Sequence, residues 1–301
     1  MPFGVVPRVI TVVGPTAAGK SALSVALAHE LGGEVVNADS MQLYRGMDIG
    51  TAKLTEAERE GVPHHLLDIW DVTVAAAVAE YQTLARAAID DILARGNVPL
   101  LVGGSGLYIR AVLEEFDFPG TDPSIRARLE EELATAGPGV LHERLRHWDP
   151  AAAEKILPSN GRRIVRALEV IELTGRPFTA ALPQPTPYYE SVQIGVDREV
   201  AALDARIGRR VEIMWAAGLV DEVRALPGIR EGRTASRALG YQQAIAQLDG
   251  EMTEAEAIAS TIQGTRRFVR RQRSWFRRDP AIVWLDGASD TLVADALAAT
   301  R

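Results

Sequence analysis

The chain of 301 residues contains no cysteine. This absence excludes a disulfide framework and a thiolate metal site. No apolar run is long enough to cross a bilayer, and residues 1–7 carry no charge, so the basic start of a secretory signal is missing. Aromatic residues are scarce, at 6%, although 47% of the chain is hydrophobic, as in an ordinary protein with a full core. We therefore expect a cytoplasmic protein without a membrane partner, built from one large domain or two smaller ones.

Basic residues are fewer than acidic ones, 33 against 40, which gives a net charge of -7. This average argues weakly against a nucleic-acid partner. The arginines, however, are unevenly distributed. Residues 265–278 contain no acid and a dense set of arginines: Arg266, Arg267, Arg270, Arg271, Arg273, Arg277 and Arg278. In an acidic protein, one such basic segment favours a specific polyanionic partner.

One short segment matches the phosphate-loop pattern G-x-x-x-x-G-K-[ST]. Its residues are Gly14, Pro15, Thr16, Ala17, Ala18, Gly19, Lys20 and Ser21. The β-branched run 8–13 predicts a buried strand before it, and residues 21–28 predict a helix after it. One anion would then be bound by the backbone N–H groups of the loop and by the Lys20 charge, and the Ser21 hydroxyl would bind Mg²⁺. The pattern predicts a diphosphate or triphosphate site, and a chance strand–helix turn is the alternative.

Two further turns follow predicted strands. Residues 35–36 read as a strand with Asp39 just beyond it, and residues 97–102 as a strand that ends in a glycine turn around Ser105. Ligands of open α/β sheets bind outside the carboxyl ends of the strands, so we expect Asp39 and Ser105 beside the phosphate loop, although Asp39 could equally cap a turn. We find no other acid at such a strand end. This weakens an ATPase or GTPase interpretation, which needs a strand-end Asp for Mg²⁺.

The pattern changes near residue 117, where strand signals stop until about residue 190. We predict an α/β fold with a P-loop NTPase-like parallel sheet flanked by helices, formed by residues 1–117 and 190–301. Residues 118–189 would form a small all-helical insertion domain, bounded by linkers at 118–123 and 176–187. Its predicted helices are 124–136, 139–147, 150–156 and 161–173. In the core we predict helices at 74–95, 107–115 and 198–226, a helix start near 237, strands at 191–196 and 281–285, and an irregular segment at 43–65.

The motifs together resemble those of the bacterial tRNA dimethylallyltransferases, also called tRNA isopentenyltransferases. Besides the phosphate loop, the matching segments are Asp39-Ser40-Met41-Gln42, Met47-Asp48-Ile49-Gly50-Thr51-Ala52-Lys53, Pro63-His64-His65-Leu66-Leu67-Asp68, Gly103-Gly104-Ser105-Gly106-Leu107-Tyr108, Arg163-Ile164-Val165-Arg166-Ala167-Leu168-Glu169-Val170, Leu239-Gly240-Tyr241 and Arg271-Gln272-Arg273-Ser274-Trp275-Phe276-Arg277. They cover nearly the whole chain in order. The phosphate loop alone is unspecific, whereas the set is specific.

The resemblance implies a reaction. The phosphate loop would hold dimethylallyl diphosphate, and the N6 amine of the adenosine at position 37 of a tRNA, 3′ of the anticodon, would attack the allylic carbon and release pyrophosphate. The resemblance gives Asp39 the role of general base. It gives Ser105 and Arg237 the contacts that complete the diphosphate and tRNA sites. Mg²⁺, held through Ser21, is the implied cofactor. The implied partners are dimethylallyl diphosphate and the anticodon stem-loop of tRNA, and we expect a monomer.

The resemblance also places residues against tRNA. In order they are Asp39, Ser40, Met41, Gln42, Ser105, Arg126, Arg162, Arg163, Arg166, Arg237, Gly240 and Gln242, to which the basic segment adds Arg270 and Arg271. Three positions depart from the family pattern. Ser105 replaces a common Thr, Arg162 a common Gln, and Gln242 a frequent Arg or Lys. The Cys/His zinc tail of eukaryotic relatives is missing, which favours a bacterial-type enzyme. For the insertion arginines, a solvated helix face is the alternative.

The residues leave three alternative functions open. A small-molecule kinase would share the phosphate loop, but it gives no reason for the basic segment 265–278. An RNA-binding protein with a nucleotide switch would need a second strand-end Asp for Mg²⁺. An isopentenyltransferase acting on free adenine nucleotides would need neither the helical insertion nor the basic segment.

Overall fold

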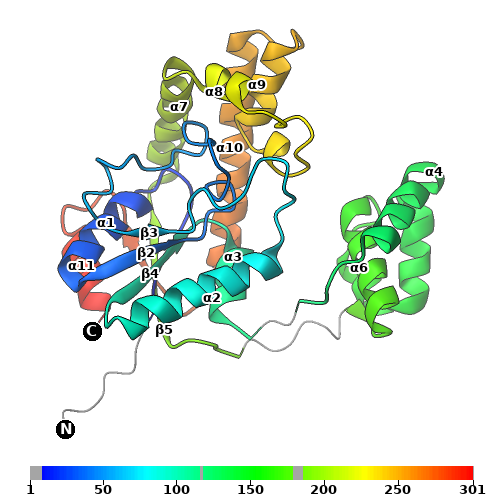
Figure 1. Cartoon of the computed structure of the whole chain (residues 1–301), viewed down its shortest axis with the longest axis horizontal. Coiled ribbons are helices and arrows are strands. Elements are labelled where there is room, and N and C mark those ends of the chain that lie inside the picture. Colours follow the sequence, from blue (N-terminus) through cyan, green and yellow to red (C-terminus); the bar gives the residue numbers. More distant parts are fainter. Residues whose placement is uncertain (1–8, 116–117, 179–185, 301) are drawn as a thin grey trace. The chain divides into compact units, whose positions relative to one another are not determined.

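The computed structural model describes residues 9–115, 118–178 and 186–300. The chain divides into two compact units, residues 1–113 with 188–301 and residues 114–187; Figure 1 colours both along the chain. These edges lie within a few residues of the domain boundaries expected from the sequence. The predicted strand residue 8, the predicted core edge near 117 and the linker residues 179–185 lie outside the described residues.

A six-stranded parallel sheet forms the centre of the core unit, with strand order β3-β2-β4-β1-β5-β6. Its strands are β1 (Val9–Val13), β2 (Gly33–Asn37), β3 (His64–His65), β4 (Val98–Gly103), β5 (Ser191–Asp197) and β6 (Ile282–Asp286). The predicted parallel sheet is confirmed. The segment 43–65 is not wholly irregular, because His64 and His65 pair with β2 as an added edge strand.

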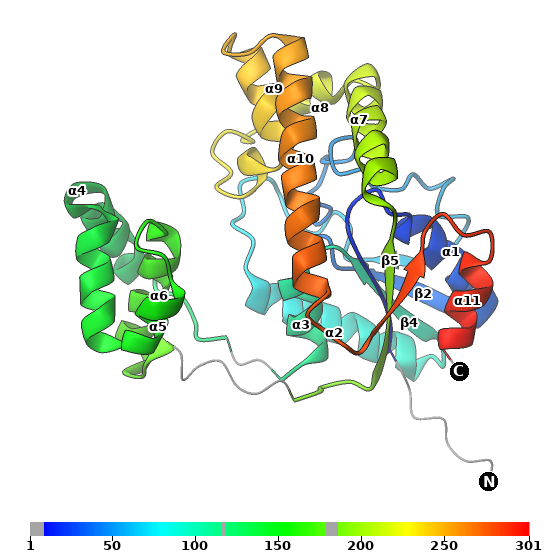
Figure 2. The ribbon, with the colours of Figure 1, turned by 180° about the vertical axis from the view of Figure 1, so that it is seen from behind.

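Helices cover both faces of this sheet (Figures 1 and 2). They are α1 (Lys20–Leu31) and α11 (Leu292–Ala299) on one face, and α2 (Val78–Ala94) and α3 (Gly106–Leu113) on the other. The side chains of β1 alternate accordingly. Val9 and Val13 join one hydrophobic cluster, and Ile10 and Val12 join the other. The central strands are thus buried on both faces, which explains their continuous apolar sequence.

A layer of helices extends from the sheet, as Figure 2 shows. It consists of α7 (Val200–Ala216), α8 (Leu219–Ala225), the 3₁₀ turn Ala235–Arg237, α9 (Tyr241–Leu248) and α10 (Glu254–Phe276). The stretch predicted to be helical over 198–226 is helical but divided in two, because Gly218 at φ 96° separates α7 from α8. The helix expected near residue 237 starts at Tyr241, and the one expected from residue 74 starts at Val78.

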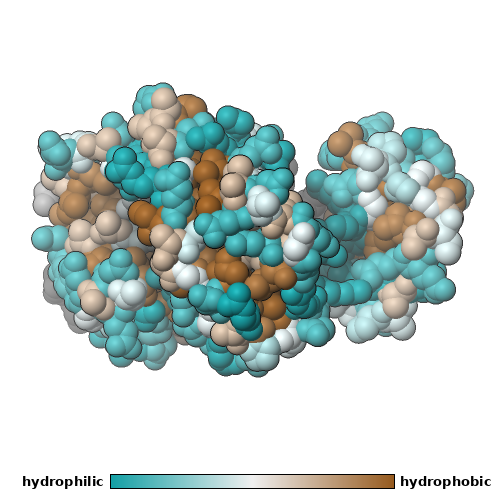
Figure 3. Space-filling model, turned by 90° about the horizontal axis from the view of Figure 1, so that it is seen from above, coloured by the Kyte–Doolittle hydropathy of each residue, from teal (hydrophilic) through white to brown (hydrophobic). Residues whose placement is uncertain are grey.

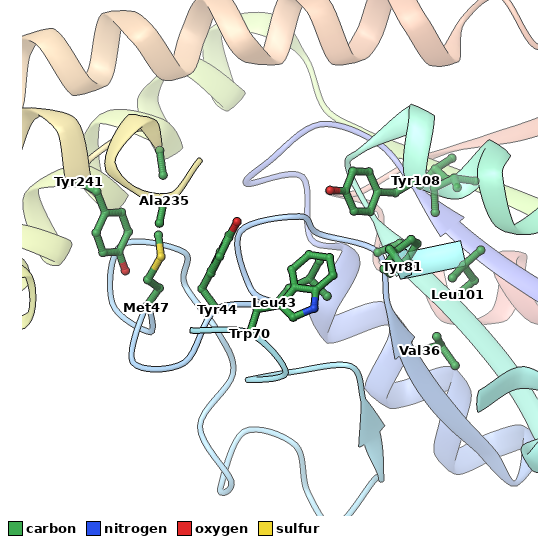
Figure 4. Packing of buried hydrophobic residues seen from close by; sticks show 14 of the residues in the cluster. Val36, Leu43, Tyr44, Met47, Trp70, Tyr81, Leu101, Tyr108, Ala235 and Tyr241 are labelled. Carbon is green, nitrogen blue, oxygen red and sulfur yellow. The ribbon is translucent and has the colours of Figure 1, made fainter. Parts of the chain in front are cut away.

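The larger hydrophobic cluster joins the sheet to this layer (Figure 4). Val36 and Leu101 contribute from the strands, and Tyr81 and Tyr108 pack beside them with ring centroids 4.6 Å apart. Leu43, Tyr44, Met47 and Trp70 continue the cluster through the segment after β2, and Tyr241 and Ala235 complete it from the helical layer. This packing fixes the segment that carries the motif residues 39–53.

The second unit has its own core around Leu129, Leu141 and Leu168. Its helices are α4 (Pro123–Trp148), α5 (Pro150–Lys155) and α6 (Gly161–Thr174). The two helices predicted over 124–136 and 139–147 are the two halves of α4, separated by a kink at Gly137 with φ 79°. No helix in the described part of the chain is long and apolar enough to cross a membrane. On the face in Figure 3, hydrophilic residues surround separate hydrophobic patches.

Candidate active site

The phosphate loop connects the end of β1 to the start of α1, as predicted. Gly14 and Gly19 have φ values of 136° and 118°, and Ala17 is also left-handed at φ 65°. A Cβ on Gly14 would clash with the Val196 carbonyl, so only glycine fits there. No side chain caps the start of α1. Its first N–H groups and its dipole can therefore meet an anion.

A cavity of about 410 Å³ opens beside this loop. The residues that line it include Thr16, Lys20, Ser21, Asp39, Gln42 and Arg210. Residues from the ends of β1, β2 and β4 thus meet at one site, as expected for the carboxyl edge of a parallel sheet. Which ligand the loop binds remains a prediction.

Lys20 is half-buried and points back along the loop. Its Nζ donates a hydrogen bond to the Pro15 carbonyl at 2.8 Å. Burial lowers the pKa of Lys20 from 10.5 to about 8, although the nearby Asp39 charge acts in the opposite direction. The fold therefore holds a costly positive charge against the cavity, and a bound anion would relieve this cost.

Two arginines at the cavity were missed by the sequence analysis. Arg206 and Arg210 from α7 line it, and the Arg206 Nε donates to the Ala17 carbonyl at 3.0 Å. With Arg209 they also line an adjoining cavity of about 380 Å³. Burial lowers the pKa of Arg210, and the Asp39 charge partly opposes the shift. Their helical spacing was a usable signal, but only the tertiary fold brings α7 to the loop.

Asp39 lies at the end of β2, in the position expected for a base. Its Oδ1 accepts the Met41 N–H at 3.0 Å, and its own N–H bonds to the Asn37 Oδ1 at 3.0 Å. Asp39 therefore does cap its own turn. This fixes one carboxylate oxygen, while Oδ2 accepts no hydrogen bond from the described residues. Capping the turn and serving as a base are compatible.

Gln42 lines the cavity together with Asp39, whereas Ser105 does not line it and contacts the residue after Asp39. The Ser105 Oγ lies 3.4 Å from the Ser40 Oγ, so the glycine turn after β4 meets the segment after β2. The Gln42 Nε2 donates to the Thr51 and Ala52 carbonyls at 3.1 and 3.4 Å. These bonds fix the amide orientation and leave the Gln42 Oε1 available as an acceptor at the cavity.

Glu222 in α8 holds the segment to which Gln42 bonds. Its carboxylate accepts the backbone N–H groups of Asp48 at 3.1 Å and Ile49 at 2.7 Å. The Tyr241 hydroxyl donates to the same carboxylate. Lys53 supports the segment from the other side through an ion pair with Asp68 at 2.6 Å. Hydrogen bonds to the half-buried Glu222 and the ion pair of the largely buried Lys53 thus hold the segment in one shape.

Other predicted contacts lie away from the cavity. Arg237 is exposed on the 3₁₀ turn and does not line the cavity. Gln242 is exposed, whereas Gly240 is buried at φ 91° and its N–H bonds to Gln243. For these three residues tRNA contact stays a prediction, and Gly240 is explained equally well as a backbone requirement.

The expectation that Asp39 is the only acid at a strand end near the loop is wrong. Asp197 ends β5, which pairs with β1. Its Oδ2 accepts hydrogen bonds from Arg273 at 2.8 Å and Arg277 at 2.9 Å, and its Oδ1 accepts the Arg198 N–H at 2.9 Å. Because two guanidinium groups already neutralise it, Asp197 is a poor ligand for Mg²⁺.

The basic segment 265–278 does not form a single face. Arg266, Arg270, Arg273 and Arg277 lie on one side of α10 and pair with Asp204 or Asp197. Arg267 and Arg271 lie on another side and are exposed, without an ion pair among the described residues. Four of the seven arginines thus pair with acids distant in sequence, and Arg267 and Arg271 are available to bind a polyanion.

The four arginines of the second unit that were predicted to contact tRNA also divide into two pairs. Arg126 and Arg166 both bind Glu169, which is completely buried, and Arg166 also donates to the Pro119 carbonyl at 2.6 Å. Burial alone would raise the pKa of Glu169, but hydrogen bonds from these arginines outweigh it and lower the pKa. Arg126 and Arg166 therefore have a structural role here. Arg162 and Arg163 remain exposed.

The cavity can hold Mg²⁺ only if the protein and the substrate phosphates bind the ion together. In the described ranges no group of three or more His, Asp or Glu could hold a metal by itself. The Ser21 hydroxyl and the Asp39 carboxylate line the same cavity. Mg²⁺ takes one or two protein oxygens and completes its shell with water and substrate phosphates. The oxygen donors present fit that mode of binding.

Fold and site together define a phosphate-loop α/β protein whose cavity is lined by cationic side chains and by the Asp39 carboxylate, among others. A model of the IPP transferase family matches residues 42–279. The chain is 75% identical to the tRNA dimethylallyltransferase of Salinispora arenicola, over 97% of this chain and 86% of that one. It is 64% identical to that of Thermobifida fusca, over 96% and 93% of the two chains.

Solved structures agree with these relatives. The tRNA isopentenylpyrophosphate transferase of Bacillus halodurans is 42% identical, with a TM-score of 0.70 over 96% of this chain and 93% of that one. A eukaryotic dimethylallyltransferase acting on tRNA is 26% identical, with a TM-score of 0.84 over 97% and 77%. The chain belongs to the IPP transferase family, that is, to the tRNA dimethylallyltransferases.

Proposed function

We propose that the protein transfers a dimethylallyl group from dimethylallyl diphosphate to the N6 amine of adenosine 37 in tRNA. The nitrogen forms a bond to the allylic carbon, the carbon–oxygen bond to the diphosphate breaks, and pyrophosphate leaves. The observation that carries this proposal is the single cavity of about 410 Å³ that brings Lys20 and Arg210 opposite Asp39. A leaving diphosphate and a nucleophile that must lose a proton require such a pair of charges.

The cationic side of the cavity would take the diphosphate. The N–H groups at the start of α1, the Lys20 ammonium and the Arg210 guanidinium lie on this side. They would stabilise the charge that builds up on the leaving oxygen. The Ser21 hydroxyl would hold Mg²⁺, which neutralises part of the diphosphate charge when bound.

The acidic side would receive the adenine. The Asp39 Oδ2 would accept a proton from N6 as the new bond forms, while the bond from the Met41 N–H keeps the carboxylate in place. Gln42 lines the cavity with Asp39, and Ser105 contacts Ser40 beside it; both would contact the base or its ribose. Adenine is stacked in an anticodon loop, so it would have to leave the stack to reach Asp39.

The RNA would be bound through exposed arginines. Arg267 and Arg271 on α10, together with Arg162 and Arg163 on the second unit, have no acidic partner among the described residues. Phosphate contacts of this kind hold a folded RNA largely without reading its sequence. We also propose that the enzyme acts as a monomer in the cytoplasm, where tRNA is found; light scattering with and without RNA tests the oligomeric state.

A three-tube assay with Mg²⁺ tests the reaction. The first tube contains dimethylallyl diphosphate and an unmodified anticodon stem-loop, the second replaces the RNA with AMP, and the third contains only ATP. Prenylated RNA and pyrophosphate in the first tube alone are expected. Product with AMP would indicate the modification of free nucleotides, and phosphate released only from ATP would indicate a hydrolase or kinase.

A further inference from the structure

The side chain of Gln272 lies between two glycine-rich turns that border the cavity. It belongs to the last turns of α10 and is 6% exposed. Its Oε1 accepts the Thr16 N–H at 3.0 Å, and its Nε2 donates to the Gly104 carbonyl at 2.9 Å. One amide thus joins the phosphate loop after β1 to the turn after β4, which is the neighbouring strand.

These two bonds require an amide. A carboxylate has no donor for the Gly104 carbonyl, and an ammonium group has no acceptor for the Thr16 N–H. Removing either bond would leave a backbone group unpaired in a buried place. The approach is also close, since a Cβ on Gly104 would clash with the Gln272 Nε2, and one on Gly106 would clash with the Trp275 ring. The turn after β4 is therefore shaped to receive this face of α10.

The position of Gln272 determines what the amide can control. Thr16 lines the cavity with the loop residues that follow it, and Gly104 comes directly after Gly103, which also lines the cavity. Both polar atoms of the Gln272 amide are already bonded to the backbone. Because Gln272 also does not line the cavity, its side chain would act on a ligand through the two turns and not by touching it.

We propose that Gln272 is a positioning residue, whose amide holds the phosphate loop and the Gly103–Gly106 turn at the separation that a diphosphate requires. The inference rests on the proposed function in one respect, namely that the loop takes a diphosphate. It assigns a part of α10 to the diphosphate site, although that helix carries arginines proposed to bind RNA.

Replacement by methionine separates positioning from packing. Gln272→Met keeps the length of the side chain and removes both hydrogen bonds. The affinity for inorganic pyrophosphate with Mg²⁺, measured by calorimetry, should fall between about 10-fold and 100-fold. The control is Gln263→Met, at an exposed position of the same helix, which should bind as the wild type does. Wild-type affinity in folded Gln272→Met, or an equal loss in the control, would overturn the proposal.

Replacement by glutamate adds a test that simple loss of stability would not reproduce. The ionised Gln272→Glu side chain lacks the donor, whereas its protonated form again has one donor and one acceptor. The ratio of its pyrophosphate dissociation constant to that of the wild type should fall towards one between about pH 8 and about pH 5, the range in which a buried glutamate takes up its proton. A ratio independent of pH would overturn the proposal. This variant decides the question if Gln272→Met does not fold.

Failure of this proposal can be distinguished from failure of the proposed function. Pyrophosphate binding by the variants tests Gln272, whereas dimethylallyl transfer by the wild-type protein tests the reaction. A wild-type protein that binds pyrophosphate but does not transfer a prenyl group refutes the proposed function and leaves the Gln272 result standing.

Discussion

The affinity for dimethylallyl diphosphate should fall as the pH rises past about 8, because Lys20 then loses its charge. The side chain is half-buried, and its Nζ donates to the Pro15 carbonyl at 2.8 Å. Burial lowers its pKa from 10.5 to about 8. The positive form is thus disfavoured in the free protein, and a bound diphosphate should raise the pKa again because it supplies the missing opposite charge.

The size of the effect follows from the pKa. Lys20 is about nine-tenths charged at pH 7 and about one-tenth charged at pH 9. If only the charged form binds, the dissociation constant at pH 9 is about tenfold that at pH 7, which corresponds to about 1.4 kcal/mol. A phosphate ester loses its last proton near about pH 6, so the ligand itself does not titrate in this range.

Calorimetry at these pH values, in two buffers of different ionisation heat, measures both affinity and proton uptake. At pH near 8, binding should take up about half a proton. The control is Lys20→Met, which should bind weakly and without this pH dependence. A constant affinity for the wild type between pH 7 and pH 9 would refute the assignment of the buried ammonium to the diphosphate.

Four further changes test the site and its supports. Asp39→Asn should lower turnover by about two to four decades while dimethylallyl diphosphate still binds, because the change removes the base and leaves the phosphate loop and Lys20 in place. Changing Arg267 and Arg271 together to alanine should weaken tRNA binding and lower its salt slope by about 1.5, measured by filter binding. Glu169→Gln should destabilise the second unit by about 3 kcal/mol in denaturant unfolding, because two guanidinium groups lose a buried partner. Glu222→Gln should reduce transfer about tenfold at unchanged diphosphate affinity, since the segment that orients Gln42 loosens.

Each of these predictions has an outcome that would contradict it. Full turnover in Asp39→Asn removes this residue from proton transfer. An unchanged salt slope in the Arg267 and Arg271 variant shows that the RNA is bound elsewhere. The control replaces Arg273 and Arg277, which bind Asp197, with alanine and should mainly lower stability. Glu169 has a lowered pKa, so its stabilising effect is present above pH 4.5 and is lost as the pH falls through its folded pKa. A stability that does not change on acidification would count against the Glu169 assignment.

The sequence alone determined those features that depend on neighbouring residues. The phosphate loop required Gly14 and Gly19 in left-handed conformations, and their spacing to Lys20 is local. The apolar strands and the position of Asp39 after β2 were also readable, because strand and turn patterns are short-range. The set of motifs was specific enough to indicate the family before the structure was known.

Only the tertiary structure decided which charges are free. Seven arginines in 265–278 looked equivalent, but Asp197 and Asp204 reach four of them from segments far away in sequence. Arg126 and Arg166 bind the buried Glu169 for the same reason. The contribution of α7 to the cavity and the bridge made by Gln272 also depend on helices packing across the sheet edge. Such pairings are set by the global fold, so no local pattern in the sequence could reveal them.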